Sequence, residues 1–137
     1  MVYARRQKPA RWSERTEMPL KVVDASALGA LVFGEPGAEM VAKQLSRSTL
    51  VAPQLLWFEL ASIAFKKAAR HPGLVEQIRE AFRMARLAIE ILSVDHLEII
   101  DLAAQARLTT YDASYLWLAR KTGGELVTLD KRLLRCQ

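Results

Sequence analysis

Apolar residues form two kinds of pattern along this chain, short aliphatic runs and longer amphipathic stretches, and the two alternate from residue 20 onward. The short β-rich runs predict strands at 20–23, 49–52, 89–94 and 125–129. The longer stretches, in which apolar residues recur every three or four positions, predict helices at 25–33, 38–45, 53–70, 74–88, 95–106 and 112–122. Pro53 suits the opening of its helix, because its missing N–H falls where no helical partner exists.

This alternation predicts the fold class. Strands separated by helices need right-handed crossover connections, which give a mostly parallel sheet with helices on both faces. We therefore expect an α/β fold, a three-layer α/β/α sandwich around a central sheet of four to five strands. In such sheets a ligand site lies beyond the carboxyl ends of the strands, where the direction of the connections reverses.

Four acidic residues stand in or next to these apolar segments. Asp24 directly follows the first predicted strand, Asp130 follows the last, and Asp112 opens a predicted helix. Glu59 interrupts the apolar run Leu-Leu-Trp-Phe-Glu-Leu-Ala within the long helix. If the first and last strands are neighbours, the carboxylates of Asp24 and Asp130 lie at the same edge of the sheet.

Each acid also has a simpler explanation when it is taken alone. Asp24, Asp112 and Asp130 all occupy positions where a helix N-cap aspartate would accept a hydrogen bond from the next turn. Glu59 could be a solvated side chain at the margin of the buried helix face. The order and inferred strand-end positions of the four acids together favour a shared site.

Charge is unevenly distributed along the 137 residues. The net charge of +5 and the sequence pI near 9.7 favour a polyanionic partner, either nucleic acid or an acidic protein. Residues 1–19 carry five basic and two acidic groups, hence 5 − 2 = +3, and they contain few aliphatic residues. We expect 1–19 to be a mobile basic leader and 20–137 to be the folded domain. A start assigned too early, with Met18 as the true first residue, explains the leader equally well.

Composition excludes several classes of protein. A single cysteine, Cys136, cannot form an internal disulfide, which fits a reducing cytoplasm. Neither a signal peptide nor a membrane helix is expected, because no apolar run approaches the roughly 20 residues that a membrane span needs. His71 and His96 lack partners at zinc-ligand spacing. Glu35 stands where a phosphate-binding P-loop requires lysine, and no Gly-x-Ser-x-Gly elbow supports a serine hydrolase.

Four segments, in this order, resemble the PIN-domain ribonucleases and, within them, the VapC-like toxins of bacterial and archaeal toxin–antitoxin pairs. They are Val22-Val23-Asp24-Ala25-Ser26, the Glu59 helix, Leu108-Thr109-Thr110-Tyr111-Asp112-Ala113-Ser114-Tyr115 and Leu126-Val127-Thr128-Leu129-Asp130. The resemblance spans essentially all of residues 20–137. It implies a PIN-like fold, a Mg²⁺- or Mn²⁺-dependent endoribonuclease with one or two ions, a homodimer, and a cognate antitoxin that occupies the acidic site.

The resemblance also assigns roles to the acids. Asp24 and Asp112 are expected to be the direct metal ligands, with Glu59 and Asp130 completing the catalytic pocket directly or through water. Carboxylate oxygens are the ligands that Mg²⁺ takes, and clustered acids repel one another unless a cation neutralises them. The ion would activate water for attack on phosphorus.

Further residues could assist RNA binding. The hydroxyls of Ser26 and Thr128 could position water or phosphate, although local backbone hydrogen bonding explains them as well. Phosphate contacts are expected from cations on the Glu59 helix, namely Lys66, Lys67 and Arg70. A second basic row, Arg79, Arg83 and Arg86, could be a solvated helix face or a phosphate-binding one. The aromatic side chains of Tyr111, Tyr115 and Trp117 could stack on bases or belong to the core.

Two other functions stay open from the sequence. One is a catalytically silent RNA- or protein-binding module on the same fold, against which the retention of all four acids argues. The other is an acidic-pocket phosphohydrolase, although Asp24-Ala25-Ser26 replaces the Asp-x-Asp signature of one common phosphatase group. The chain also departs from the family pattern, because 23 residues precede Asp24 and the first catalytic aspartate usually lies nearer the start.

Overall fold

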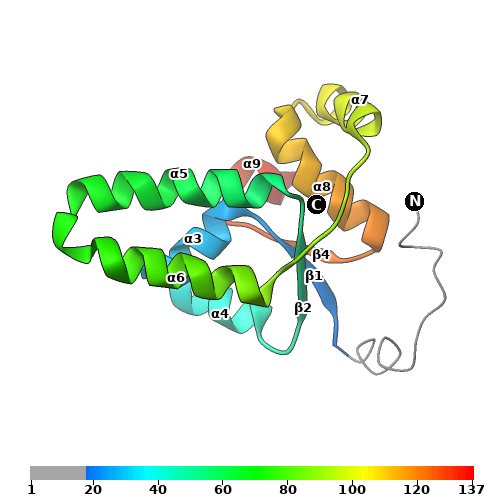
Figure 1. Ribbon diagram of the computed structural model, residues 1–137. Helices are drawn as coiled ribbons and strands as arrows, with labels where there is room; N and C mark the ends of the chain where they lie inside the picture. The colour runs from blue at the N-terminus through cyan, green and yellow to red at the C-terminus, as the bar shows by residue number, and fades with distance from the viewer. Residues whose placement is uncertain (1–17) are drawn as a thin grey trace.

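The computed structural model describes residues 18–137, and the expected leader at 1–19 therefore falls almost wholly outside the described residues (Figure 1). The strands are β1 (Leu20–Val23), β2 (Thr49–Ala52), β3 (Glu90–Ile91) and β4 (Glu125–Val127). The helices are α3 (Ala25–Phe33), α4 (Ala38–Leu45), α5 (Leu55–Arg70), α6 (Val75–Ala88), α7 (His96–Ala106), α8 (Thr110–Thr122) and α9 (Lys131–Arg135). A short 3₁₀ turn at Pro72–Leu74 joins α5 to α6.

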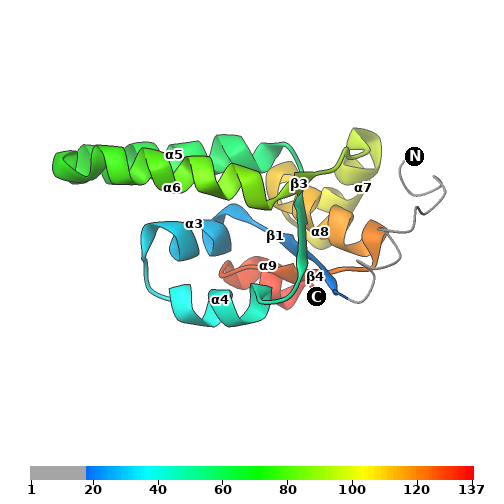
Figure 2. The same cartoon turned by 60° about the horizontal axis from the view of Figure 1, so that its bottom comes forward.

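The four strands form one parallel sheet in the order β3-β2-β1-β4. The first and last strands are therefore neighbours, with Val23 of β1 paired to Val127 of β4. Figure 2 shows helices on both sides of the strands. This arrangement confirms the predicted α/β/α sandwich around a central parallel sheet, here of four strands. Strands β2 and β3 are added on one side of β1 and β4 on the other, so the connections change direction between β1 and β4, which places the switch point next to Asp24.

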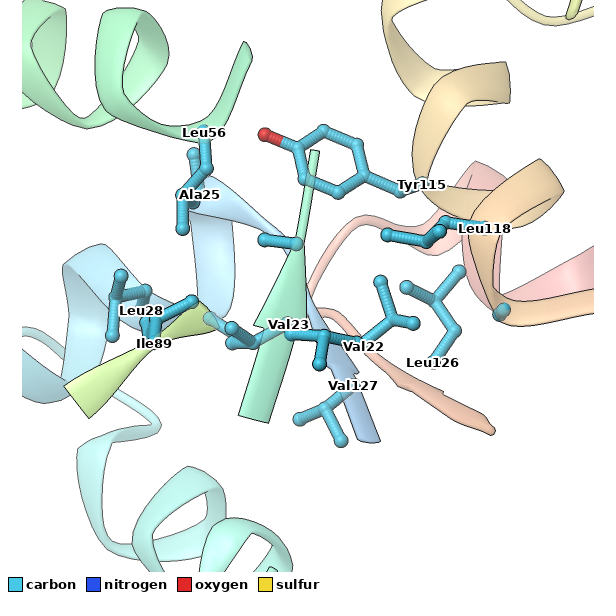
Figure 3. Packing of buried hydrophobic residues seen from close by; sticks show 14 of the residues in the cluster. Val22, Val23, Ala25, Leu28, Leu56, Ile89, Tyr115, Leu118, Leu126 and Val127 are labelled. Carbon is cyan, nitrogen blue, oxygen red and sulfur yellow. The ribbon is translucent and has the colours of Figure 1, made fainter. Parts of the chain in front are cut away.

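Residues of β1 lie at the centre of the hydrophobic core. Val22 and Val23 are fully buried, and Figure 3 shows them among Leu126, Val127 and other apolar side chains. The neighbouring strand comes close because Gly124 has no side chain: a Cβ there would lie 2.7 Å from the carbonyl oxygen of Leu20. A tightly packed core of this kind holds the carboxyl ends of the strands in fixed positions.

Helices α5 and α6 form an antiparallel hairpin that extends away from the sheet (Figure 1). Trp57 and Phe82 make a tilted ring contact across it, with centroids 6.0 Å apart. At its base α5 packs on α3, where Gly29 leaves room for the side chain of Ile63. This packing fixes α5 beside the end of β1. Among residues 18–137, no helix combines the length and apolar character needed to cross a membrane.

Several predicted boundaries were wrong by one to three residues. Helix α8 begins at Thr110, because the side chain of Thr109 accepts the backbone N–H of Asp112 and so caps the helix. Helix α5 begins at Leu55, two residues after Pro53, which is buried at the end of β2. Strands β3 and β4 are shorter than predicted, and the helix α9 was not predicted.

Candidate active site

A cavity of about 300 Å³ at the carboxyl edge of β1 and β4 brings the four predicted acids together. Asp24 directly follows β1, Glu59 comes from α5, Asp112 from the first turn of α8, and Asp130 precedes α9. Ser26, Ser62 and Tyr115 also line this cavity, which we call the acid pocket. Four carboxylates that are as far as 106 positions apart in the chain thus share one small space.

Asp24 is the most firmly held of the four. Its side chain is only 4% exposed and caps α3, accepting the backbone N–H of Ala27 at 3.0 Å. The hydroxyl of Ser26 donates to its Oδ1 at 2.7 Å, and the hydroxyl of Thr128 donates to its Oδ2. The capping explanation is therefore correct for Asp24, and it coexists with a place in the pocket.

Ser26 and Thr128 form hydrogen bonds that link the segment after β1 to the segment after β4. The Ser26 Oγ accepts the backbone N–H of Leu129 at 3.0 Å, and the Thr128 Oγ1 accepts that of Asp130 at 2.9 Å. The two hydroxyl oxygens lie 3.3 Å apart. Both side chains thus bond to the backbone, as the alternative explanation from the sequence predicted. Their hydroxyls also donate to the Asp24 carboxylate and hold it in place. Their role in positioning water or phosphate stays a prediction.

Glu59 is oriented by a tyrosine. The hydroxyl of Tyr115, on α8, donates to Glu59 Oε1 at 2.6 Å. Tyr115 is 1% exposed, and Figure 3 shows its ring pointing from α8 toward α5. Because the ring is buried, it cannot stack on an RNA base. The alternative prediction, that Tyr115 belongs to the core, is therefore correct. Sequence reasoning missed the contact with Glu59, because the 56-residue separation gives no local signal.

Asp112 and Asp130 are more accessible to water. Asp130 caps α9, accepting the N–H of Arg132 at 2.8 Å. Asp112 lies in the first turn of α8 and does not cap it, because Thr109 performs that role. The simpler explanation is therefore correct for Asp130 and wrong for Asp112. A carboxylate in the first turn is still favoured by the helix dipole.

The pocket raises the pKa of three of its carboxyl groups. For Asp24, burial is the largest influence and raises the pKa of the carboxyl. The hydrogen bonds from Thr128 and Ala27 act in the opposite direction and lower it. Burial also raises the pKa of Glu59, with smaller contributions from Asp112 and Asp24. For Asp112, burial and then the charge of Asp130 raise the pKa. Clustered negative charge in a partly dry space is costly, and a bound cation would relieve that cost.

The donor set fits a hydrated divalent ion. Within residues 18–137, no three His, Cys, Asp or Glu side chains are grouped closely enough to enclose a metal ion as they stand. Mg²⁺ keeps several of its waters and is usually held by only one or two carboxylates, so it does not need such a cage. An oxygen-only pocket with four carboxylates suits Mg²⁺ or Mn²⁺ rather than a zinc-like ion.

The predicted RNA-contacting cations differ in availability. Lys66 and Arg70 are exposed on α5. Lys67 is instead paired with Glu35 at the end of α3, and this pair lowers the pKa of the Glu35 carboxyl. Among the other aromatic candidates, Tyr111 is 61% exposed, whereas Trp117 donates its Nε1–H to Glu98 at 2.8 Å.

Comparison with known proteins places this arrangement in a family context. The PIN domain, as a sequence family, matches residues 21–137. A curated relative, Ribonuclease VapC3 from Pyrobaculum aerophilum, is 33% identical over 122 residues, which cover 82% of this chain and 90% of the relative. The crystal structure of PAE2754 from the same organism superposes with a TM-score of 0.71 at 27% identity, covering 85% of this chain and 84% of that one.

Proposed function

The chain belongs to the PIN-domain family, and on that basis we propose that it is a divalent-metal-dependent endoribonuclease that hydrolyses phosphodiester bonds of RNA. The observation that carries the proposal is the acid pocket, where Asp24, Glu59, Asp112 and Asp130 line one cavity and burial raises the pKa of three of them. The relative named Ribonuclease VapC3 supports this reaction class.

Mg²⁺, or Mn²⁺ in its place, would be held by Asp24 and Asp112, with Glu59 and Asp130 contributing directly or through water. When bound, one or two such ions would activate a water for attack on phosphorus and stabilise charge on the phosphate oxygens. The protein itself supplies pre-organisation. Ser26 and Thr128 hold both oxygens of Asp24, and Tyr115 holds one oxygen of Glu59, so neither carboxylate is free to rotate away from the pocket.

RNA would approach across α5. The acid pocket repels phosphate, so cations at its margin are needed to bring the backbone close. Lys66 lies two turns beyond Glu59 on the same side of α5, and Arg70 lies one turn further. Lys67 would have to leave Glu35 before it could bind a phosphate. Lys66 and Arg70 are therefore the stronger candidates for phosphate contacts.

The proposed biological role is that of the toxin in a toxin–antitoxin pair in the cytoplasm. The VapC name of the curated relative supports it. In this role the chain would form a homodimer, and a cognate antitoxin protein would occupy the acid pocket and block RNA. The pocket's excess of carboxylates suits a cationic side chain of such an inhibitor.

The decisive experiment compares the wild-type protein with Asp24→Asn and Asp112→Asn on total RNA and tRNA, with Mg²⁺, with Mn²⁺ and with EDTA. We expect the wild type to cleave only with a divalent ion, and each variant to lose at least about 100-fold in rate. Circular dichroism of each variant checks that the loss of cleavage is not a loss of folding.

Equal cleavage by the variants, or cleavage indifferent to EDTA, would contradict the metal site. Binding of RNA without cleavage across a broad set of substrates would instead support the silent RNA-binding module.

A further inference from the structure

A second cavity, of about 430 Å³, lies on the same edge of the sheet as the acid pocket. It sits beyond β2 and β3, where Pro53 directly follows β2 and Val94 follows β3. The start of α5, the N-terminal part of α7 and the first turn of α8 enclose it, and these segments come together in both Figure 1 and Figure 2. We call it the side cavity.

The side cavity and the acid pocket share two walls. On α5, Leu55 lines the side cavity and Glu59, one turn later, lines the acid pocket. On α8, Tyr111 faces the side cavity, whereas the next residue, Asp112, faces the acid pocket. A polymer whose phosphate sits at the carboxylates therefore has its adjoining unit within reach of the side cavity.

The lining of the side cavity differs chemically from that of the acid pocket. Among the described residues that line it, none is Asp, Glu, Lys or Arg. Its walls are mainly apolar, and they include Ile99 and Ile100 of α7 and Leu55 of α5. Such a surface disfavours a phosphate and favours an uncharged, flat group, and the cavity volume falls in the roughly 300–1,000 Å³ range of small-ligand sites.

A few polar and aromatic groups at the rim suit a nucleobase. Tyr111 is 61% exposed, so its ring is available for stacking. Its backbone is fixed, because the Ser114 hydroxyl donates to the Tyr111 carbonyl oxygen at 2.6 Å. Gln54, His96 and Thr110 also line the cavity and can donate or accept hydrogen bonds at a base edge.

We propose that the side cavity is a base-recognition subsite, which takes the unpaired base of the nucleotide next to the scissile phosphate, with Tyr111 as the stacking platform. This inference rests on the proposed ribonuclease function and deepens it by placing substrate selection beside the chemistry. It requires single-stranded RNA, because a base in a duplex is not free to enter a cavity.

The test uses the full-length protein and an RNA pool with a randomised single-stranded region, with the cut positions read by sequencing. We expect the wild type to show a nucleotide bias at one position beside the cut. Tyr111→Ala flattens that bias and raises KM about tenfold on the preferred sequence, with kcat within about twofold, because stacking contributes to binding rather than to the chemical step. Tyr111→Phe keeps the bias, because the ring remains.

Phe65→Ala is the matched control, since Phe65 is an exposed aromatic on α5 that lines neither cavity. It retains both the bias and KM. A Tyr111→Ala variant that keeps the wild-type bias and KM would overturn the subsite. The alternative occupant of this face is a second copy of the chain, and sedimentation of the same variants tests for it. If Tyr111→Ala loses a dimer but keeps the nucleotide bias, the face is an interface between copies and the subsite is overturned.

A binding measurement separates failure of the subsite from failure of the proposed activity. Fluorescein-labelled hexamers of A, C, G or U, and the same hexamers with one abasic position, are titrated against Asp24→Asn, which we expect to keep the fold and to lose cleavage. We expect the affinity to depend on the base, and this dependence to disappear when Tyr111→Ala is combined with Asp24→Asn in one chain. That result would support the subsite even if the wild type cuts no RNA. Equal affinity for intact and abasic hexamers would overturn it, whatever the wild type cleaves.

Discussion

The carboxyl edge of the sheet is divided into two unlike halves. Beyond β1 and β4, four carboxylates line the acid pocket and three of them have raised pKa values. Beyond β2 and β3, the side cavity is lined by apolar and uncharged polar groups. Both halves include residues of α5 and of the first turn of α8, so a change of one position along α8, from Tyr111 to Asp112, passes from one environment to the other.

Charged side chains, rather than cavity volume, distinguish the two halves of the edge. The acid pocket is the smaller of the two cavities. It is suited to a cation and the phosphate that the cation attracts, whereas the larger side cavity is suited to the uncharged part of a nucleotide. Variants on the shared walls can therefore separate rate from substrate binding.

The largest effect is expected from Glu59→Gln. It removes one carboxylate from the acid pocket and keeps the shape and the Tyr115 hydrogen bond. We expect kcat to fall about 100-fold with KM within about twofold, the opposite pattern to Tyr111→Ala. Steady-state cleavage of one RNA measures both constants. A rise in KM without loss of kcat would place Glu59 in binding, and the two halves would no longer differ in role.

The next effect concerns stability, because Asp24 is built into the fold. Asp24→Ala removes the cap of α3 and the acceptor for three donors, so we expect a loss of about 2–3 kcal/mol in the free energy of unfolding. Asp24→Asn keeps one acceptor oxygen and also removes the buried charge whose pKa is raised by burial, so the free energy of unfolding should change by less than about 1 kcal/mol. Urea unfolding of both variants tests this, and equal losses would show that the hydrogen bonds contribute little.

Tyr115→Phe should have an intermediate effect on the reaction. It removes the hydroxyl that orients Glu59 and leaves the buried ring in place. We expect about a tenfold loss of kcat and little change in KM, as is typical when a residue that orients a ligand is removed. A matched control is Tyr111→Phe, which removes an exposed hydroxyl one turn away. Full activity in Tyr115→Phe would mean that the protein does not need to hold Glu59.

The cations of α5 should show a smaller, salt-dependent effect. Lys66→Gln removes an exposed charge and should weaken RNA binding about threefold, reducing the slope of log affinity against log salt by roughly 0.7 for single-stranded RNA. Lys67→Gln should leave the slope unchanged, because Lys67 is already paired with Glu35. Titrations at several salt concentrations distinguish the two. Equal slopes for both variants would remove Lys66 from the binding surface.

The smallest effect follows from the raised pKa of Asp112. A carboxyl whose folded-state pKa exceeds its unfolded value of about 4 makes the protein less stable as pH rises through the folded-state pKa. In EDTA at pH 7, Asp112→Asn should therefore raise the midpoint of thermal unfolding by about 2 °C, a small gain because water screens this carboxyl.

The gain should vanish below pH 4, where Asp112 is protonated in both states, and shrink when Mg²⁺ stabilises the wild type. The exposed Asp101 on α7 offers a control, since Asp101→Asn lies outside the acid pocket. A stabilisation that is as large at pH 3.5 as at pH 7 would contradict this account.

Much of the fold was predictable because hydrophobic periodicity reports burial directly. The alternation of β-rich runs and amphipathic stretches predicted the parallel sheet, and the strand-end positions of Asp24 and Asp130 placed two carboxylates together. The error at Asp112 has a local cause: Thr109 and Asp112 both suit an N-cap, and only the structure shows that Thr109 accepts the N–H. The length of β3 depends on edge pairing with β2, which periodicity does not encode.

The contacts that assemble the site could not be predicted, because they join distant positions. Tyr115 and Glu59 are 56 residues apart, and Ser26 and Thr128 are 102 apart. Each of these residues has an ordinary explanation in its own segment, as core, cap or turn. The side cavity could not be predicted from the sequence either. Its walls come from separate segments, mainly α5, α7 and α8, and none of its described lining residues is charged.

The adjacency of β1 and β4 has a consequence for synthesis of the protein. The Thr128 hydroxyl that holds Asp24, and Asp130 itself, are synthesised more than 100 residues after Asp24. A nascent chain that has reached only residue 120 has three of the four acids but lacks the strand that pairs with β1 on that side. The acid pocket therefore cannot be complete until β4 and Asp130 have been translated.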